Sequence, residues 1–421
     1  MSVSSNESEL RYRGKTSEES EAKEVLGKAV DDKPTTADSV DLRKTFWLTR
    51  IVFLRSLAFI YFVAFLISFD QNKELIGDNG LTPTKLYLKR IKERVDVDSN
   101  WKLYMKFPTL FWFLSSWDHL DYILDLTAIC GEILLICINV LKIYHIFNYC
   151  YILISGMFLS AFVLIFGSAN SVIMGLLWIL YHTLVNVGQI WFSFGWESQL
   201  LETGFLAIWI VPFFSLCQST VRPSNLAIYG YRWLITRIML GAGLIKIRGD
   251  PCWKDFTCMN YFYETQPNPN PMSYYSHAAP ATWHIFEVLG NHMVELICPF
   301  LTFIPLRWAA LLNGFWQILF QIILISTGNL SFLNWLTVLP SIWFFDDKIW
   351  MGIFSQDTIS KVIELEQDDK QKNSEKSNVR FGVSIIIGGM IAYLSIPIVQ
   401  NLISPRQVMN TSFEPFRLGN Y

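Results

Sequence analysis

The stretch WLTRIVFLRSLAFIYFVAFLISF, residues 47–69, is the first of about ten apolar stretches that decide the fold class of this 421-residue chain. It has roughly the 20 residues that a helix needs to cross a bilayer. The others lie at 122–141, 149–166, 172–194, 200–216, 226–247, 285–303, 306–326, 330–345 and 381–403. Each must be helical, because lipid offers no water to backbone polar groups. The sequence predicts an all-α, polytopic transmembrane helix bundle with about 8–10 hydrophobic segments.

The composition supports a membrane protein and excludes a nucleic-acid binder. The chain is 52% hydrophobic, 15% aromatic and only 17% charged, with a mean hydropathy of +0.31. Such values lie outside the usual range of soluble domains. The net charge is −2 and no cluster of Lys and Arg is present, whereas phosphate binding needs such a cluster. The lipid bilayer is therefore an expected partner, and nucleic acid is not.

Polar segments divide the chain. The predicted units are a disordered cytosolic tail at 1–42, a transmembrane bundle at 43–347 with a lumenal Cys/Pro loop at 248–283, a polar cytosolic loop at 348–380, a last transmembrane helix at 381–403 and a lumenal segment at 404–421. Arg43, Lys44 and Arg50 favour a cytosolic start for the first span. A partial or re-entrant element is predicted near Tyr122, because acidic residues at 121, 125 and 132 are costly beside lipid.

The segment LGAGLIKIRGDPCWKDFTCMNYFYETQPNPNP, residues 240–271, contains the predicted end of a membrane helix. Pro251 cannot continue that helix. Cys252 and Cys258 are the obvious disulfide candidate, and a redox-exchange pair or free thiols are the alternatives. The sequence predicts no metal site, since no second close Cys or His pair completes a zinc set.

The prolines at 267, 269 and 271 predict an extended arm, which serves either as a contact surface for a polypeptide or as a rigid cover.

Two further segments contain polar groups inside apolar stretches. In FSFGWESQLLETGF, residues 192–205, Glu197 and Glu202 are expected to form a structural ion pair or hydrogen-bonded network, with proton transfer as the alternative. Their candidate partners are Arg232, Arg237 and Lys246. In WHIFEVLGNHMVELICPF, residues 283–300, four polar residues share one helical face, which predicts a buried polar network, or a metal site as the alternative. They are His284, Glu287, Asn291 and Glu295.

No catalytic motif or cofactor fingerprint is found, so no catalytic residue and no cofactor are predicted.

The segments GWESQLLETGF, LGAGLIKIRGDPCWKDFTC and YFYETQPNPNP resemble the lipase maturation factor family. The resemblance extends from about residue 46 to PSIWFFDD at 340–347 and to SFEPFRLGNY at the C-terminus. The matching motif positions are Gly195, Trp196, Glu197, Leu200, Leu201, Glu202, Gly204, Phe205, Gly249, Asp250, Pro251, Cys252, Trp253, Asp255, Cys258, Tyr263, Glu264, Thr265, Gln266, Pro267 and Pro271.

This resemblance implies a multi-pass protein of the endoplasmic reticulum membrane. It implies a non-enzymatic, chaperone-like assembly factor for the folding, dimerisation and maturation of secreted dimeric lipases such as lipoprotein lipase. Other folding factors of the endoplasmic reticulum are implied partners. The family continues into a C-terminal lumenal domain, so residues 404–421 are expected to be the start of a truncated domain. The motif positions are expected to bind the client or to support the structure.

Two rival functions belong to other classes. The first is a membrane-embedded enzyme distantly like the vitamin K-dependent carboxylase. It would need a titratable centre, for which the candidates are His284, Glu287, His292 and Lys246. The second is a transporter, which intramembrane charges favour and the lack of evident internal repeats disfavours.

Overall fold

A computed structural model of the chain describes residues 41–95, 99–114, 117, 156–218, 221–266, 270–372, 377–409 and 415–419. All regular elements in these ranges are helical, which confirms the all-α fold class. Residues 1–40 of the tail predicted at 1–42, the stretch at 122–141 with its re-entrant character, and the prolines at 267 and 269 lie outside the described residues. Leu42, at the end of the predicted tail, is buried and begins a short 3-10 helix, Leu42–Lys44.

The predicted apolar stretches within the described ranges contain helices. The longer ones are α2 (Trp47–Ile76), α8 (Gly156–Phe166), α9 (Ser171–Val187), α10 (Gly195–Ala207), α11 (Asn225–Gly249), α15 (Ala281–His292), α16 (Arg307–Thr327), α17 (Leu333–Ile342) and α20 (Ser377–Ile403). Shorter or more polar helices are α3 (Thr84–Val95), α4 (Asn100–Lys106), α12 (Pro251–Lys254), α13 (Met259–Phe262), α14 (Pro271–His277), α18 (Asp347–Trp350) and α19 (Gln356–Lys372). After α15 the chain continues through a π-helical turn, Met293–Ile297, and a 3-10 helix, Cys298–Phe303.

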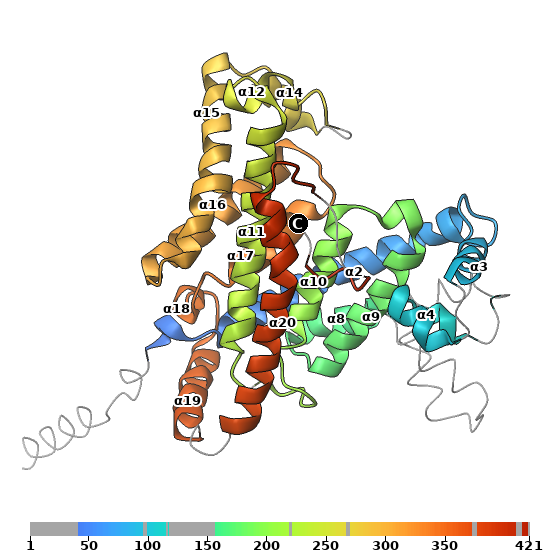
Figure 1. Ribbon diagram of the computed structural model, residues 1–421. Helices are drawn as coiled ribbons and strands as arrows, with labels where there is room; N and C mark the ends of the chain where they lie inside the picture. Colours follow the sequence, from blue (N-terminus) through green and yellow to red (C-terminus); the bar gives the residue numbers. More distant parts are fainter. Residues whose placement is uncertain are drawn as a thin grey trace, which may run out of the picture.

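Within the described ranges, four helices are long and apolar enough to cross a membrane: Trp47–Ile76, Ala281–Phe303, Arg307–Thr327 and Gly382–Ile403. Helices α8, α9 and α17 are apolar but shorter. In Figure 1, α11 and α20 run side by side and α2 crosses them, with α8 and α9 packed along α2. The chain is therefore a multi-pass membrane protein whose helices are not all parallel.

Aromatic side chains from several helices meet at Trp343, directly after α17. Trp343 is fully buried, and its ring centroid lies 5.1 Å from that of Phe53 in α2 and 5.7 Å from that of Tyr231 in α11. The Tyr231 hydroxyl donates a hydrogen bond of 2.8 Å to the carbonyl oxygen of Thr203 in α10. Because lipid tails are as apolar as these side chains, close packing and interhelical hydrogen bonds hold such helices together. These contacts fix α2, α10, α11 and α17 around one core.

The segment predicted as a solvated loop at 348–380 contains helix α19. Ile359 and Val362, three positions apart, lie on one helical face and pack against the cluster around Trp47 and Leu48 at the start of α2. Glu366 accepts a hydrogen bond of 3.1 Å from Trp47 Nε1. The segment is helical because this apolar stripe is covered by the bundle.

Candidate functional site

The break after α11 is built by the residues that the sequence singled out. The Asp250 carboxylate accepts a hydrogen bond of 3.1 Å from the Cys252 N–H and so forms the N-cap of α12. Pro251 occupies the first helical position, where its missing N–H costs nothing. The chain therefore ends one helix and starts another within two residues.

Cys252 and Cys258 are joined by a disulfide, with their Cα atoms 4.8 Å apart. The turn between them is closed by a hydrogen bond of 2.9 Å from the Thr257 N–H to the Cys252 carbonyl oxygen. Phe256 has a φ of 58°, in the left-handed region that favours glycine. Its ring packs in the cluster around Met259, which explains an aromatic residue at this position. The disulfide-bonded turn is thus a compact, side-chain-packed unit.

Residues 251–266 and 270–277, with helices α12, α13 and α14, form a cover over one end of the bundle, which we call the roof (Figure 1). The Asn270 side chain donates hydrogen bonds to the carbonyl oxygens of Ser326, at 2.9 Å, and Gly328, at 3.1 Å. Ser273 Oγ donates to the Thr327 carbonyl oxygen at 2.5 Å. The roof is therefore tied to the end of α16.

The predicted extended arm is helical from Pro271 onward. Asn270 caps α14 through a reciprocal capping box with Ser273, and Pro271 is the first helical residue. Proline excludes helix from the residues before it but is favoured at this first position. The prediction failed because it treated the last proline of the run like an interior one.

The roof is joined to α15 by a partly buried polar contact. The Tyr263 hydroxyl donates a hydrogen bond of 2.8 Å to Glu287 Oε1, which also accepts one of 3.0 Å from Trp283 Nε1. Burial and the neighbouring carboxylate raise the pKa of the Tyr263 hydroxyl above its usual range, so it remains a donor. Tyr263 therefore holds the roof on α15.

The other roof motif residues have local roles. Thr265 Oγ1 donates to the Phe262 carbonyl oxygen at 3.0 Å, and Gln266 Oε1 lies 3.4 Å from Ser273 Oγ. Glu264 Oε1 lies 2.8 Å from His277 Nε2. These contacts stabilise the turn between α13 and α14.

The four polar residues predicted to share one face of the 283–300 segment contact three different parts of the protein. His284 contacts the roof, with Nδ1 2.8 Å from Asn260 Oδ1. Glu287 binds Tyr263, as described above. Asn291 and Glu295 both accept hydrogen bonds from Lys246 Nζ, at 2.8 and 2.7 Å. The face is thus a set of structural polar contacts.

Lys246 contacts the roof as well as α15. Its Nζ lies 4.7 Å from the ring centroid of Trp253, in a cation–π contact. His292 Nε2 lies 2.9 Å from the Trp253 carbonyl oxygen. The groups named for an enzymatic centre, Lys246, His284, Glu287 and His292, therefore all have structural partners, and Lys246 and His292 share Trp253.

In the α10 segment, Glu202 forms a buried ion pair with Arg237 of α11. This is one of the bases that the sequence offered. The others bind elsewhere: Arg232 Nε donates to the Trp343 carbonyl oxygen at 2.9 Å, and Lys246 pairs with Glu295. Helix α10 is thereby fixed to α11.

Glu197 has a partner that sequence reasoning missed. It accepts a hydrogen bond from the Tyr181 hydroxyl of α9 and one of 2.9 Å from Trp196 Nε1. Tyr181 lies in an apolar stretch without a charge or turn signal, so nothing local marked it. The Trp196 ring also stacks on Phe194, with centroids 4.5 Å apart.

Gly204 allows α10 to approach α2. A Cβ atom at this position would lie only 1.9 Å from Tyr61 Oη. Gly195 is the first residue of α10 and lines a cavity described next. Gly204 therefore allows close helix packing, and Gly195 forms part of the cavity wall.

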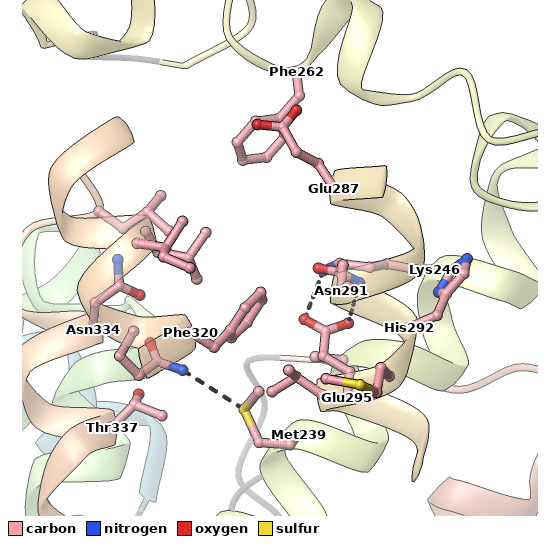
Figure 2. A pocket seen from close by; sticks show the side chains of 18 of the residues that line it. Met239, Lys246, Phe262, Glu287, Asn291, His292, Glu295, Phe320, Asn334 and Thr337 are labelled. Atoms are coloured by element: carbon pink, nitrogen blue, oxygen red, sulfur yellow. Dashed lines mark hydrogen bonds and ion pairs between the residues drawn. The ribbon is translucent and has the colours of Figure 1, made fainter. Parts of the chain in front are cut away.

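A cavity of about 1010 Å³ lies beneath the roof, between α10, α11, α15, α16 and α17. Figure 2 shows Glu287, Asn291 and Glu295 on one wall, and Asn334 and Thr337 on the opposite wall. Most of the lining is apolar. The two motif segments, far apart in the sequence, thus border the same space.

The comparisons with known proteins agree on one family. Residues 48–154 and 140–352 match the family model described as lipase maturation factor transmembrane domain. The chain is 49% identical over 386 residues to lipase maturation factor 1 of Mus musculus, covering 89% of this chain and 62% of that protein. For the Bos taurus protein the identity is 47% over 385 residues, with 89% and 64% covered.

A more distant relative is lipase maturation factor 2 of Xenopus tropicalis, which is 32% identical over 306 residues, covering 72% of this chain and 39% of that protein. No solved structure matches the chain. The chain spans 62% and 64% of the length of the two lipase maturation factor 1 proteins above. The family model covers well over half of the chain, and we conclude that the chain belongs to the lipase maturation factor family.

Proposed function

We propose that this protein acts at the endoplasmic reticulum membrane as a chaperone-like assembly factor that helps secreted dimeric lipases to fold and dimerise. The family name and the names of the relatives support a role in lipase maturation. The membrane helices would anchor the factor, and the roof would face the lumen. Other folding factors of that compartment are proposed as further partners.

The observation that carries the proposal is the aromatic surface of the roof. Tyr261, Tyr274 and Tyr275 are 62%, 74% and 68% exposed. Aromatic side chains give large contact area for little rotamer entropy and are enriched at binding hot spots. The disulfide and the Asn270 contacts hold this surface in place, which lowers the entropy cost of binding. A partly folded lipase with exposed apolar surface would bind here.

The structure changes which aromatic residues are candidates for client contact. Tyr263 is only 5% exposed and its hydroxyl points to Glu287, so it supports the roof from inside. Trp253 is partly buried against Lys246. We therefore assign client contact to Tyr261, Tyr274 and Tyr275.

The test is secretion of active lipoprotein lipase from cells that lack their own lipase maturation factor. The unchanged chain is expected to raise it. The double variant Tyr274→Ala/Tyr275→Ala is expected to lose most of that increase at an equal membrane level. Phe213→Ala/Phe214→Ala is the matched control, because Phe213 and Phe214 are also an exposed, edge-to-face pair but lie outside the roof.

The outcomes separate two parts of the proposal. Rescue by the unchanged chain and by both double variants would remove the roof surface from the mechanism. No rescue by the unchanged chain would contradict the lipase role of this chain. The disulfide is tested in the same cells with Cys252→Ser/Cys258→Ser, for which we expect a lower yield of active lipase dimer.

A further inference from the structure

The chain that leaves α20 forms part of the wall of the cavity beneath the roof. Residues 404–409, which we call the flap, lie beside α11 and below the roof (Figure 1). Met409 lines the cavity together with Ser198 of α10 and Ala242 of α11. A Cβ atom on Gly241 would lie 3.6 Å from the Met409 sulfur, so Met409 packs directly on α11. The flap therefore completes the cavity wall on the side of α10 and α11.

One arginine holds the flap on the last turn of α11. Arg248 Nη1 donates hydrogen bonds to the carbonyl oxygens of Leu402, at 2.8 Å, and Ser404, at 3.1 Å. The same nitrogen donates to Gln407 Oε1 at 2.8 Å. The Gln407 amide in turn donates to the Gly241 carbonyl oxygen at 2.8 Å. Arg248 is thus the main attachment of the flap, and Gln407 is a second one.

Few apolar contacts add to these hydrogen bonds. Pro405 and Arg406 are exposed, and Val408 is 47% exposed. Asn401 and Val408 exchange two hydrogen bonds of 3.0 Å, but these only close the turn between α20 and the flap. Segments with few buried apolar contacts and exposed hydrogen bonds open locally at low free energy. The flap is therefore easier to displace than the helices around it.

We propose that the flap is a gate of the cavity, which Arg248 holds closed and which opens on the side of α10 and α11 while the helix bundle stays intact. When Arg248 releases the flap, Met409 leaves the wall and water-soluble molecules reach the cavity between Ser198 and Ala242. Arg248 lies two residues before Asp250, the cap of α12, so the gate and the roof share the last turn of α11. The gate controls access to the cavity whether or not the roof binds a lipase.

The experiment measures how fast a thiol inside the cavity reacts with a water-soluble reagent. Thr337 lines the cavity from α17 and is only 3% exposed. The full chain with Thr337→Cys is placed in lipid nanodiscs and treated with sulfonatoethyl methanethiosulfonate, a small anion whose charge keeps it out of lipid. Mass spectrometry of the peptides separates the new thiol from the native cysteines. We expect a slow reaction while the flap is held by Arg248.

Three further substitutions, each combined with Thr337→Cys, change the gate. Arg248→Ala should speed the reaction about tenfold or more, because the rate follows the open population and charged hydrogen bonds are lost. Gln407→Ala should speed it less, since Arg248 keeps its two carbonyl contacts. Met409→Ala removes the wall side chain without touching the attachments and should also speed it. Arg406→Ala is the matched control, because the exposed Arg406 side chain forms no hydrogen bond or ion pair with another described residue.

A second thiol separates opening of the gate from general unfolding. Ser341, one turn further along α17, is fully buried and outside the cavity, so Ser341→Cys should stay unreactive with every flap substitution. Unchanged reaction of Thr337→Cys with both Arg248→Ala and Met409→Ala would overturn the proposal. So would an equal increase with Arg406→Ala, or reaction of Ser341→Cys at the same rate, because the cavity would then be reached without a specific gate.

Discussion

The carboxylate of Asp347 accepts a hydrogen bond of 2.8 Å from the backbone N–H of Trp47, 300 positions away in the sequence. The same carboxylate accepts from the N–H groups of Leu48, at 2.8 Å, and Thr49, at 3.0 Å. The first N–H groups of a helix have no partner within it. Asp347, which is distant in the sequence but adjacent in space, therefore supplies the missing acceptor for the start of α2 in a buried site.

Asp347→Ala is expected to destabilise the protein by about 2 kcal/mol, the upper part of the range for a lost N-cap. The measurement is the thermal unfolding midpoint of the protein in detergent. Asp357→Ala is the control, because Asp357 is exposed in the first turn of α19. Equal midpoints for the two variants would show that the Asp347 cap is energetically unimportant.

Removing one partner of the ion pair between Glu202 and Arg237 should destabilise the protein more than removing both partners. Glu202→Leu leaves a buried guanidinium without its counter-charge, and we expect a loss of about 3–5 kcal/mol. Glu202→Leu/Arg237→Leu should recover most of that loss, because no charge remains buried. A double-mutant cycle on unfolding midpoints measures the coupling, and purely additive effects would contradict a direct pair.

The contact between Gly204 and Tyr61 predicts a substitution that is partly corrected by a second one. Gly204→Ala places a methyl group against the Tyr61 hydroxyl and should destabilise the protein by about 1–3 kcal/mol. The Tyr61 hydroxyl is buried and has no partner among the described residues. Tyr61→Phe should therefore be tolerated alone and should recover part of the stability lost in Gly204→Ala; the recovery is partial because the ring carbon Cζ still lies 2.9 Å from the new Cβ atom. If Tyr61→Phe does not raise the stability of Gly204→Ala, contact with the Tyr61 hydroxyl is not the cause of the destabilisation.

Loss of the disulfide should loosen the roof locally. For so short a loop, Cys252→Ser/Cys258→Ser should remove about 2 kcal/mol of local stability. Trypsin cleavage after the exposed Lys254 should then become about tenfold faster or more. Cleavage after Lys361, exposed in α19, is the internal reference and should not change. Unchanged cleavage after Lys254 would mean that packing alone holds the turn.

The sequence by itself determined the helical class, the positions of most helices and several local features. Apolar length and the absence of water in lipid leave a helix as the solution for each stretch, whatever its neighbours are. The helix end at Pro251 and the pairing of Glu202 with a base of α11 followed from local chemistry. Such properties depend on short segments, so a single sequence reveals them.

Only the tertiary structure decided which helices meet and what they enclose. The Asp347 cap, the Tyr181 partner of Glu197 and the covering of α19 all join segments that are distant in the chain or lack a local signal. The cavity exists because α15, α16 and α17 leave space beneath the roof, and Glu287 and Asn334 lie on its opposite walls only in that packing. In lipid, hydrophobicity does not choose partners among apolar helices; close packing and specific hydrogen bonds do, and these depend on three-dimensional shape.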